Sequence, residues 1–126
     1  VRLHMLFLDS NLITEKGAEG LSECLKNKQD LRVFNIDNNN IGPQGAIELA
    51  TQLTTNYGLS KLYCDSNDIG EDGAEAIAEC MEMMEYLKKI CFENNQIKDR
   101  GVIALARALE ENDTLLSLYL ENNGIT

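Results

Sequence analysis

The residues best suited to chemistry are five acidic residues that recur every 28 positions. They are Asp9, Asp37, Asp65, Glu93 and Glu121. Carboxylates can transfer protons, bind metal ions or attract cationic groups. A glycosidase needs a pair of carboxylates flanking a cleft, and calcium needs a cage of converging oxygens. A single row of carboxylates meets neither requirement, so the pattern favours binding of a cationic group.

Other motifs for catalysis or metal binding have little support in the chain. His4 is the single histidine, and the sequence contains no P-loop, nucleophile elbow, H-E-x-x-H or C-x-x-C pattern. We therefore expect no catalytic residues, no metal site and no cofactor. The prediction is that the protein is not an enzyme.

The four cysteines are expected to be reduced thiols. Cys64 takes a core strand position and Cys91 an outward one, whereas Cys24 and Cys80 lie two repeats apart. Helices pack about 8–10 Å apart and a disulfide needs Cα atoms within about 7 Å, so Cys24 and Cys80 should not pair. Proximity of Cys64 and Cys80 stays open. With no signal peptide and no transmembrane run in the sequence, we expect a cytoplasmic location.

The acidic residues belong to a fragment, L-x-x-L-x-L-x-x-N-x-I, that occurs five times without a change of spacing. The copies begin at Leu3, Leu31, Leu59, Leu87 and Leu115. A fixed period of about 20–50 residues indicates stacked units that bury their apolar faces against one another. In the third copy, residues 61–66 alternate between apolar and polar types, which predicts a short strand with the acidic residue pointing outward.

A helix is expected between consecutive strands. Apolar residues spaced i, i+3, i+4, i+7 form one stripe in each of 18–25, 46–53, 74–81 and 102–109. The stripe in the last helix comprises Val102, Leu105, Ala106 and Leu109. Turns are expected over 42–45 and 70–73, and recurring glycines predict close packing where each helix begins. These glycines are Gly17, Gly45, Gly73 and Gly101.

The order of strands and helices predicts an α/β fold with a parallel sheet and right-handed crossovers. Helices need about 8–10 Å of lateral space and strands about 4.8 Å. We therefore expect a curved solenoid with the sheet on the concave face and the helices on the convex face.

An asparagine follows each strand at the ninth position of the fragment. The five are Asn11, Asn39, Asn67, Asn95 and Asn123. Backbone groups lose their ladder partners where a strand ends, and a buried amide offers both donors and an acceptor to satisfy them. We predict a buried hydrogen-bonded spine rather than a set of ligand-binding amides.

The segment 31–53 resembles the ribonuclease-inhibitor-like class of leucine-rich repeats, whose consensus is L-x-x-L-x-L-x-x-N-x-I-G-x-x-G-A-x-x-L-A-x-x-L. The resemblance covers essentially all of residues 1–126 and implies a horseshoe that binds other proteins, usually on its concave face. The uniform spacing is similar to the 28-residue repeats of NOD-like receptors. Residues 1–126 are thus expected to form one leucine-rich-repeat domain of four full repeats plus a terminal strand. Neither end has a polar cap, which predicts a segment of a longer array.

Outward strand residues on the concave face define the expected partner-binding site. The candidates are Phe7, Asp9, Asp37, Lys61, Tyr63, Asp65, Lys89, Glu93, Tyr119 and Glu121. Aromatic side chains are common anchors at interfaces, and a cationic partner would relieve the repulsion between stacked carboxylates. The hypothesis is a site for a basic protein segment. The alternative is that duplication has kept the carboxylates only for solubility.

The composition limits the classes of partner. The chain has 126 residues, with 21 acidic against 11 basic and a net charge of −10. This balance argues against nucleic acid and anionic membranes, which both need a positive surface. We therefore predict a non-catalytic protein–protein interaction module or scaffold. The alternatives are a regulator of a small GTPase, similar to Ran GTPase activators, and a structural spacer in a cytoskeletal or ciliary assembly.

Overall fold

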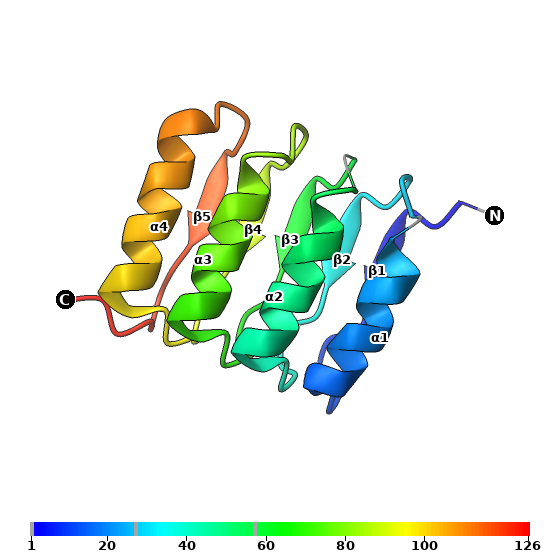
Figure 1. The fold of residues 1–126 in the computed structure, drawn as a ribbon, viewed down its shortest axis with the longest axis horizontal. Helices are drawn as coiled ribbons and strands as arrows, with labels where there is room; N and C mark the ends of the chain where they lie inside the picture. The colour runs from blue at the N-terminus through cyan, green and yellow to red at the C-terminus, as the bar shows by residue number, and fades with distance from the viewer. Residues whose placement is uncertain (1, 27, 57) are drawn as a thin grey trace.

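Strands and helices alternate strictly along the chain. The computed structural model describes residues 2–26, 28–56 and 58–126. The elements are β1 (Met5–Phe7), α1 (Glu15–Leu25), β2 (Val33–Asn35), α2 (Gly42–Leu53), β3 (Lys61–Tyr63), α3 (Gly70–Met81), β4 (Lys89–Cys91), α4 (Lys98–Glu111) and β5 (Ser117–Tyr119). Figure 1 shows the helices side by side in one layer that covers one side of the sheet. Each helix packs against the next one along the chain.

The strands form a parallel sheet in sequence order, as predicted. Their register is unshifted, so residues 28 apart lie beside each other; Val33 pairs with Lys61, and Lys61 with Lys89. Residues at equivalent positions of the five repeats therefore form rows across the sheet. The wider spacing of helices places the sheet on the concave face and the helices on the convex face.

The strands are shorter than predicted. Residues 61–66 were expected to be extended, but β3 ends at Tyr63. Ser66 has a left-handed backbone with a φ angle of 56°, which an extended strand cannot contain. The N–H groups of Cys64 and Ser66 still donate to carbonyls of the next repeat, at 3.0 and 2.8 Å. The acidic residue between them is thus held firmly although it lies outside the strand.

The turns predicted over 42–45 and 70–73 are wrong, because these residues form the first turns of α2 and α3. Gly42 and Gly70 have positive φ angles of 71° and 69°, which lets the chain enter the helix directly. Pro43 follows Gly42 in the first turn, where a missing N–H costs little.

Three of the four recurring glycines lie where neighbouring helices pack closely, as predicted; Gly17 is exposed and faces only Ile13 of its own repeat. A Cβ atom added to Gly73 would lie 3.0 Å from the Cβ of Ala46 on the preceding helix, and would also collide with the Ile69 side chain. Gly45 and Gly101 face Ala18 and Ala74 in the same way, at 3.1 Å. Each helix pair is therefore held together by a glycine packed against an alanine.

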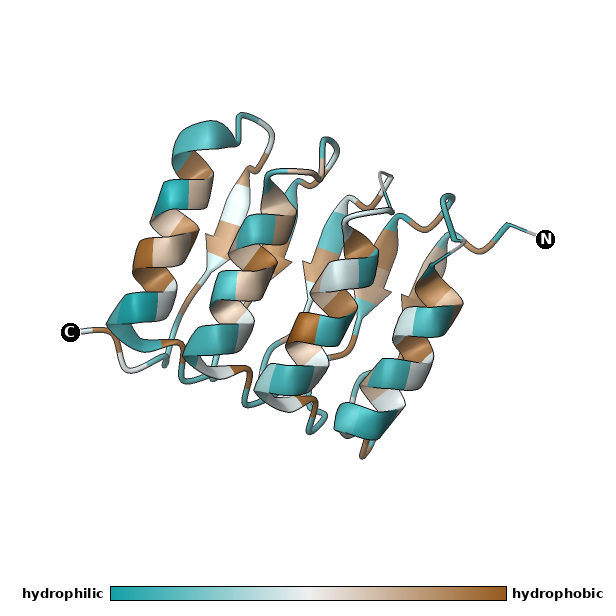
Figure 2. Ribbon diagram, in the orientation of Figure 1, coloured by the Kyte–Doolittle hydropathy of each residue, from teal (hydrophilic) through white to brown (hydrophobic). Residues whose placement is uncertain are grey.

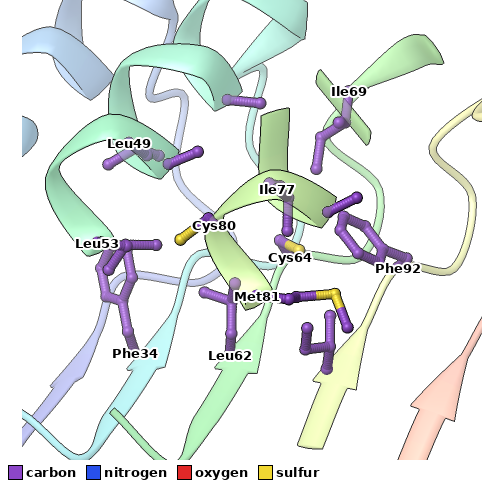
Figure 3. Packing of buried hydrophobic residues seen from close by; sticks show 14 of the residues in the cluster. Phe34, Leu49, Leu53, Leu62, Cys64, Ile69, Ile77, Cys80, Met81 and Phe92 are labelled. Atoms are coloured by element: carbon purple, nitrogen blue, oxygen red, sulfur yellow. The ribbon is translucent and has the colours of Figure 1, made fainter. Parts of the chain in front are cut away.

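The core lies between the two layers. Figure 2 shows hydrophilic and hydrophobic residues alternating along each helix, as amphipathic helices require. Figure 3 shows Phe34 beside Leu53, and Leu62 beside Met81, so these inward strand residues pack under α2 and α3. Cys64 is also buried here, as its strand position predicted.

The stripe predicted for α4 is only partly correct. Leu105 is buried and Val102 half-buried, but Ala106 and Leu109 are exposed and Ala108 is buried instead. The alanines equivalent to Ala106 are Ala50 in α2 and Ala78 in α3. Both are buried, because a following helix packs against α2 and against α3. Among the described residues no helix follows α4, so the side of α4 away from α3 stays open.

The asparagine spine is confirmed for four of its predicted members. Each of Asn39, Asn67, Asn95 and Asn123 is buried, and its side-chain Nδ2 donates to a carbonyl of the preceding repeat at 2.8–3.0 Å. Each Oδ1 accepts a backbone N–H from that same preceding repeat. Asn11 is the exception, since it is exposed and donates only to Leu8 and Asp9 of its own repeat.

The four cysteines are free, so Cys64 and Cys80 form no disulfide. Burial raises the pKa of the Cys80 thiol to about 12 and raises that of Cys64 well above its usual value. Within the described part of the chain, no helix is both long and apolar enough to cross a bilayer. The cytoplasmic location stays a prediction.

Candidate protein-binding face

The ten candidate residues all lie on the concave face, spread over the strands and the residues just after them. The five acidic residues form what we call the acidic row: Asp9, Asp37, Asp65, Glu93 and Glu121. The middle three are half-buried, and the two at the ends are exposed. Partial burial means that the row is more than solvated surface.

Two members of the acidic row bind the backbone of the next repeat. The Oδ1 atom of Asp37 accepts the N–H of Asp65 at 2.7 Å, and the Oδ1 atom of Asp65 accepts the N–H of Glu93 at 2.8 Å. The N–H of Asp37 is occupied by the Oδ1 atom of Asn35 at 2.9 Å. Sequence reasoning missed this structural role. The signal was the residue type, because aspartate and asparagine readily bond to nearby backbone groups.

The three central members of the acidic row have pKa values raised above their ordinary values. Burial is the main cause that raises the pKa of Asp37 and of Asp65; the backbone hydrogen bond that each accepts works in the opposite direction. The pKa of Glu93 is raised chiefly by a hydrogen bond shared with the Glu121 carboxyl, and then by the charge of Asp65. A positive group placed against the acidic row would lower these pKa values again.

Beside the acidic row, a lysine lies between two tyrosines. The Nζ atom of Lys89 is 5.2 Å from the ring centroid of Tyr63 and 5.2 Å from that of Tyr119. Both distances are within the range of a cation–π interaction. The pKa of Lys89 is raised, with the charge that Tyr63 acquires at high pH as the largest cause.

Cys91 lies between these tyrosines, in register with both. The sequence placed it at an outward strand position, but its exposed fraction is only 7%. The reason is its neighbours, because a large ring stands on each side and the Lys89 side chain crosses between them. We call Tyr63, Cys91 and Tyr119 the tyrosine site. Burial raises the pKa of the Cys91 thiol to about 11, so it is uncharged at neutral pH.

The remaining candidates are less closely grouped. Phe7 lies on β1, two strands away from β3, and is 55% exposed beside the equally exposed Met5. Lys61 is exposed and pairs in register with Lys89. The structure thus brings Tyr63, Lys89 and Tyr119 together but keeps Phe7 apart from them.

Comparison with known proteins gives the family of the repeats. The family described as Leucine Rich repeat matches residues 27–50, 65–78 and 85–106. The fold is that of a leucine-rich-repeat solenoid. No curated protein gives a significant match.

Among solved structures, the repeats are similar to one titled Leiomodin-1 Actin-Binding Site 2 (ABS2). The two are 25% identical with a TM-score of 0.84, and the match covers 93% of this chain and 69% of the other. Together with the matched repeats, this likeness supports a leucine-rich-repeat solenoid that acts as a protein-interaction module.

On the convex face of the leucine-rich repeats, a groove of about 560 Å³ runs between α3 and α4. Its floor includes Ala78 and Ala104, and Arg100 lies on one wall, paired with Glu71, Asp72 and Glu75. These pairs already neutralise the arginine, so the groove offers less unmatched charge than the acidic row. No cluster suited to a metal ion occurs among the described residues.

Proposed function

We propose that this protein binds a basic segment of a protein partner on its concave face, through the acidic row and the adjoining aromatic residues. The observation that carries the proposal is the unshifted register, which stacks five carboxylates beside Tyr63 and Tyr119. Proteins use such fixed patterns of charge to select partners and to speed their encounter.

The pKa values of Asp37, Asp65 and Glu93 are raised by burial and by neighbouring carboxylates, so both causes disfavour the charged forms. Like charges about 4 Å apart repel by about 1 kcal/mol in bulk water, and by more where water is partly excluded. Water is partly excluded from the half-buried Asp37 and Asp65. A lysine or arginine of the partner would convert this repulsion into attraction, and the net charge of −10 would assist the approach.

The aromatic residues supply the apolar part of the interface. Tyr119 is 38% exposed and Phe7 55% exposed, although both belong to short strands with a packed inner face. Rigid aromatic side chains of this kind bury much area at a small cost in entropy. The resemblance to the ribonuclease-inhibitor-like and NOD-like-receptor repeats also favours binding on this face.

A second candidate partner is actin. It is favoured by the likeness to Leiomodin-1 Actin-Binding Site 2, which spans nearly the whole chain. Co-sedimentation with filamentous actin, and an assay of polymerisation with monomeric actin, test this candidate. A GTP-hydrolysis assay with small GTPases tests the regulator alternative.

The main test compares two variants with the same change in charge. Asp37→Asn, Asp65→Asn and Glu93→Gln together neutralise the centre of the acidic row while keeping the oxygens that accept backbone bonds. The matched control carries Glu19→Gln, Glu82→Gln and Glu110→Gln. All three are exposed; Glu19 and Glu110 lie on α1 and α4, and Glu82 directly follows α3. The probe is a fluorescent peptide of alternating arginine and glycine, measured by anisotropy at several salt concentrations.

We expect the row variant to bind the peptide about tenfold more weakly than wild type, which corresponds to about 1.4 kcal/mol. The control should change affinity by less than about threefold, because exposed charges on the opposite face are screened. Equal losses in the two variants would reject the concave site. Actin binding that the row variant leaves unchanged would favour a different surface.

A further inference from the structure

We propose that the tyrosine site binds the guanidinium group of an arginine from the basic segment, and that Lys89 occupies this site in the free protein. The inference rests on the proposed function and names the side chain that the concave face selects. It starts from the position of the Lys89 ammonium, which is equally distant from the rings of Tyr63 and Tyr119 at 5.2 Å.

The spacing of the strands makes a two-sided aromatic site. Tyr63 and Tyr119 lie on β3 and β5, with β4 between them. Neighbouring strands are about 4.8 Å apart, so the two tyrosines stand roughly 10 Å apart. A cation between the rings can thus contact both, as the Lys89 ammonium does. The small thiol of Cys91 forms the floor and adds no charge at neutral pH.

A guanidinium fits this position better than the ammonium of Lys89. The acidic row lies directly beyond the tyrosine site, two residues further along each strand, with Asp65, Glu93 and Glu121 nearest. Lys89 enters from the opposite end of the strand and takes part in none of the salt bridges found among the described residues. An arginine has a flat group that stacks on rings and five N–H donors, so it can contact the rings and the carboxylates together.

Lys61 provides an internal comparison. It occupies the same strand position one repeat earlier and pairs with Lys89 in register. Its neighbours on the adjoining strands are Asn35 and Cys91 where Lys89 has Tyr63 and Tyr119. Removing either lysine therefore changes the net charge of the concave face equally, but only loss of Lys89 empties the tyrosine site.

The experiment measures the affinity of the fluorescent arginine–glycine peptide for Lys89→Ala and Lys61→Ala. Loss of one positive charge should by itself tighten binding of the peptide by about two- to threefold, and this is all we expect for Lys61→Ala. We expect Lys89→Ala to tighten binding by about tenfold in total, since the arginine also no longer competes with the lysine. Adding Tyr63→Leu or Tyr119→Leu to Lys89→Ala should remove the extra gain. A peptide with lysine in place of arginine should gain less affinity from Lys89→Ala than the arginine peptide does.

Alkylation of Cys91 gives a second measurement that does not depend on affinity. In Lys89→Ala, the arginine peptide should slow the reaction of Cys91 with a thiol reagent, while exposed Cys24 reacts at an unchanged rate. Mass spectrometry of the labelled peptides distinguishes the two cysteines.

The outcomes separate this inference from the proposed function. If Lys89→Ala and Lys61→Ala tighten binding equally and Cys91 is not protected, the tyrosine site is rejected while salt-dependent binding to the acidic row stands. If no variant binds the peptide, both proposals are rejected. A tenfold difference between the two lysine variants, reversed by loss of either tyrosine, supports the arginine site.

Discussion

The carboxylate of Asp37 accepts a hydrogen bond from the backbone N–H of Asp65 at 2.7 Å, across the boundary between two repeats. Asp65 makes the same bond to Glu93 at 2.8 Å. The central carboxylates therefore have a structural role whether or not a partner binds them. Reversing their charge to lysine would mix loss of binding with loss of stability, so the amide substitutions are the cleaner tool.

The first prediction concerns this backbone bond. Asp37→Ala should lower the free energy of unfolding by about 1 kcal/mol, because the N–H of Asp65 loses its partner in a half-buried position. Asp37→Asn keeps an acceptor oxygen and should be at least as stable as wild type. Urea denaturation measures both. Asp9→Ala, at the exposed end of the row, is the control; a loss there as large as in Asp37→Ala would contradict the assignment.

The second prediction concerns pH. The folded state raises the pKa of Asp37, Asp65 and Glu93 above their ordinary values, so it binds protons more readily than the unfolded chain. Their contribution to stability is therefore full below the unfolded pKa and is lost as pH rises through the folded pKa. Lowering the pH from 7 towards the ordinary values of 3.8 and 4.5 should stabilise the fold through these groups.

Urea denaturation between pH 4 and 7 checks the pH prediction by comparing wild type with the triple amide variant. The variant should lack the stabilisation on acidification and should equal or exceed wild type at pH 7. Asp99 acts in the opposite direction, because hydrogen bonds from Thr126 lower its pKa, and both proteins retain it. Identical pH profiles would show that the acidic row does not contribute.

The third prediction contrasts two glycines. Gly73→Ala should destabilise the fold by about 1–3 kcal/mol, because its methyl group would press on Ala46 and Ile69. Gly20→Ala should stabilise it by about 0.5–1 kcal/mol, since Gly20 is an exposed helical residue with no heavy atom near its added Cβ. Thermal unfolding measures both changes, and a harmless Gly73→Ala would refute the tight helix contact.

The fourth prediction contrasts two asparagines. Asn67→Ala should destabilise the fold by about 1–3 kcal/mol, because the carbonyl of Ile36 and the N–H of Ile41 lose their partner. Asn11→Ala should cost less than about 0.5 kcal/mol, since the Asn11 side chain is exposed. The denaturant midpoints of the two variants provide the test, and similar midpoints would argue against the spine.

Much of the fold could be predicted because it follows from the repeat. A leucine or asparagine that recurs every 28 residues can only be explained by equivalent positions in stacked units, and this determines the order of the strands and the rows across the sheet. Element ends were less predictable. The left-handed backbone at Ser66 and the positive φ at Gly70 depend on local torsion angles that the apolar pattern does not encode.

The candidate site was predictable in outline but not in detail. The rows that contain Tyr63, Lys89 and Tyr119 follow from the period alone. That the ammonium of Lys89 lies over both rings depends on the rotamer of a long side chain, which spacing cannot give. The burial of Cys91 depends on the same rotamer of Lys89. Likewise, the exposure of Leu109 depends on what packs beside α4 and not on its own helix.

Each buried asparagine of the spine supplies hydrogen bonds to the repeat that precedes it in the chain. The N–H of Asn67 donates to the side chain of Asn95, and the N–H of Asn95 donates to that of Asn123. On a ribosome, each loop would therefore emerge before the amide that satisfies it, and would wait for 28 more residues to be added. Folding during synthesis should advance one repeat behind the growing end, with the newest loop always incomplete.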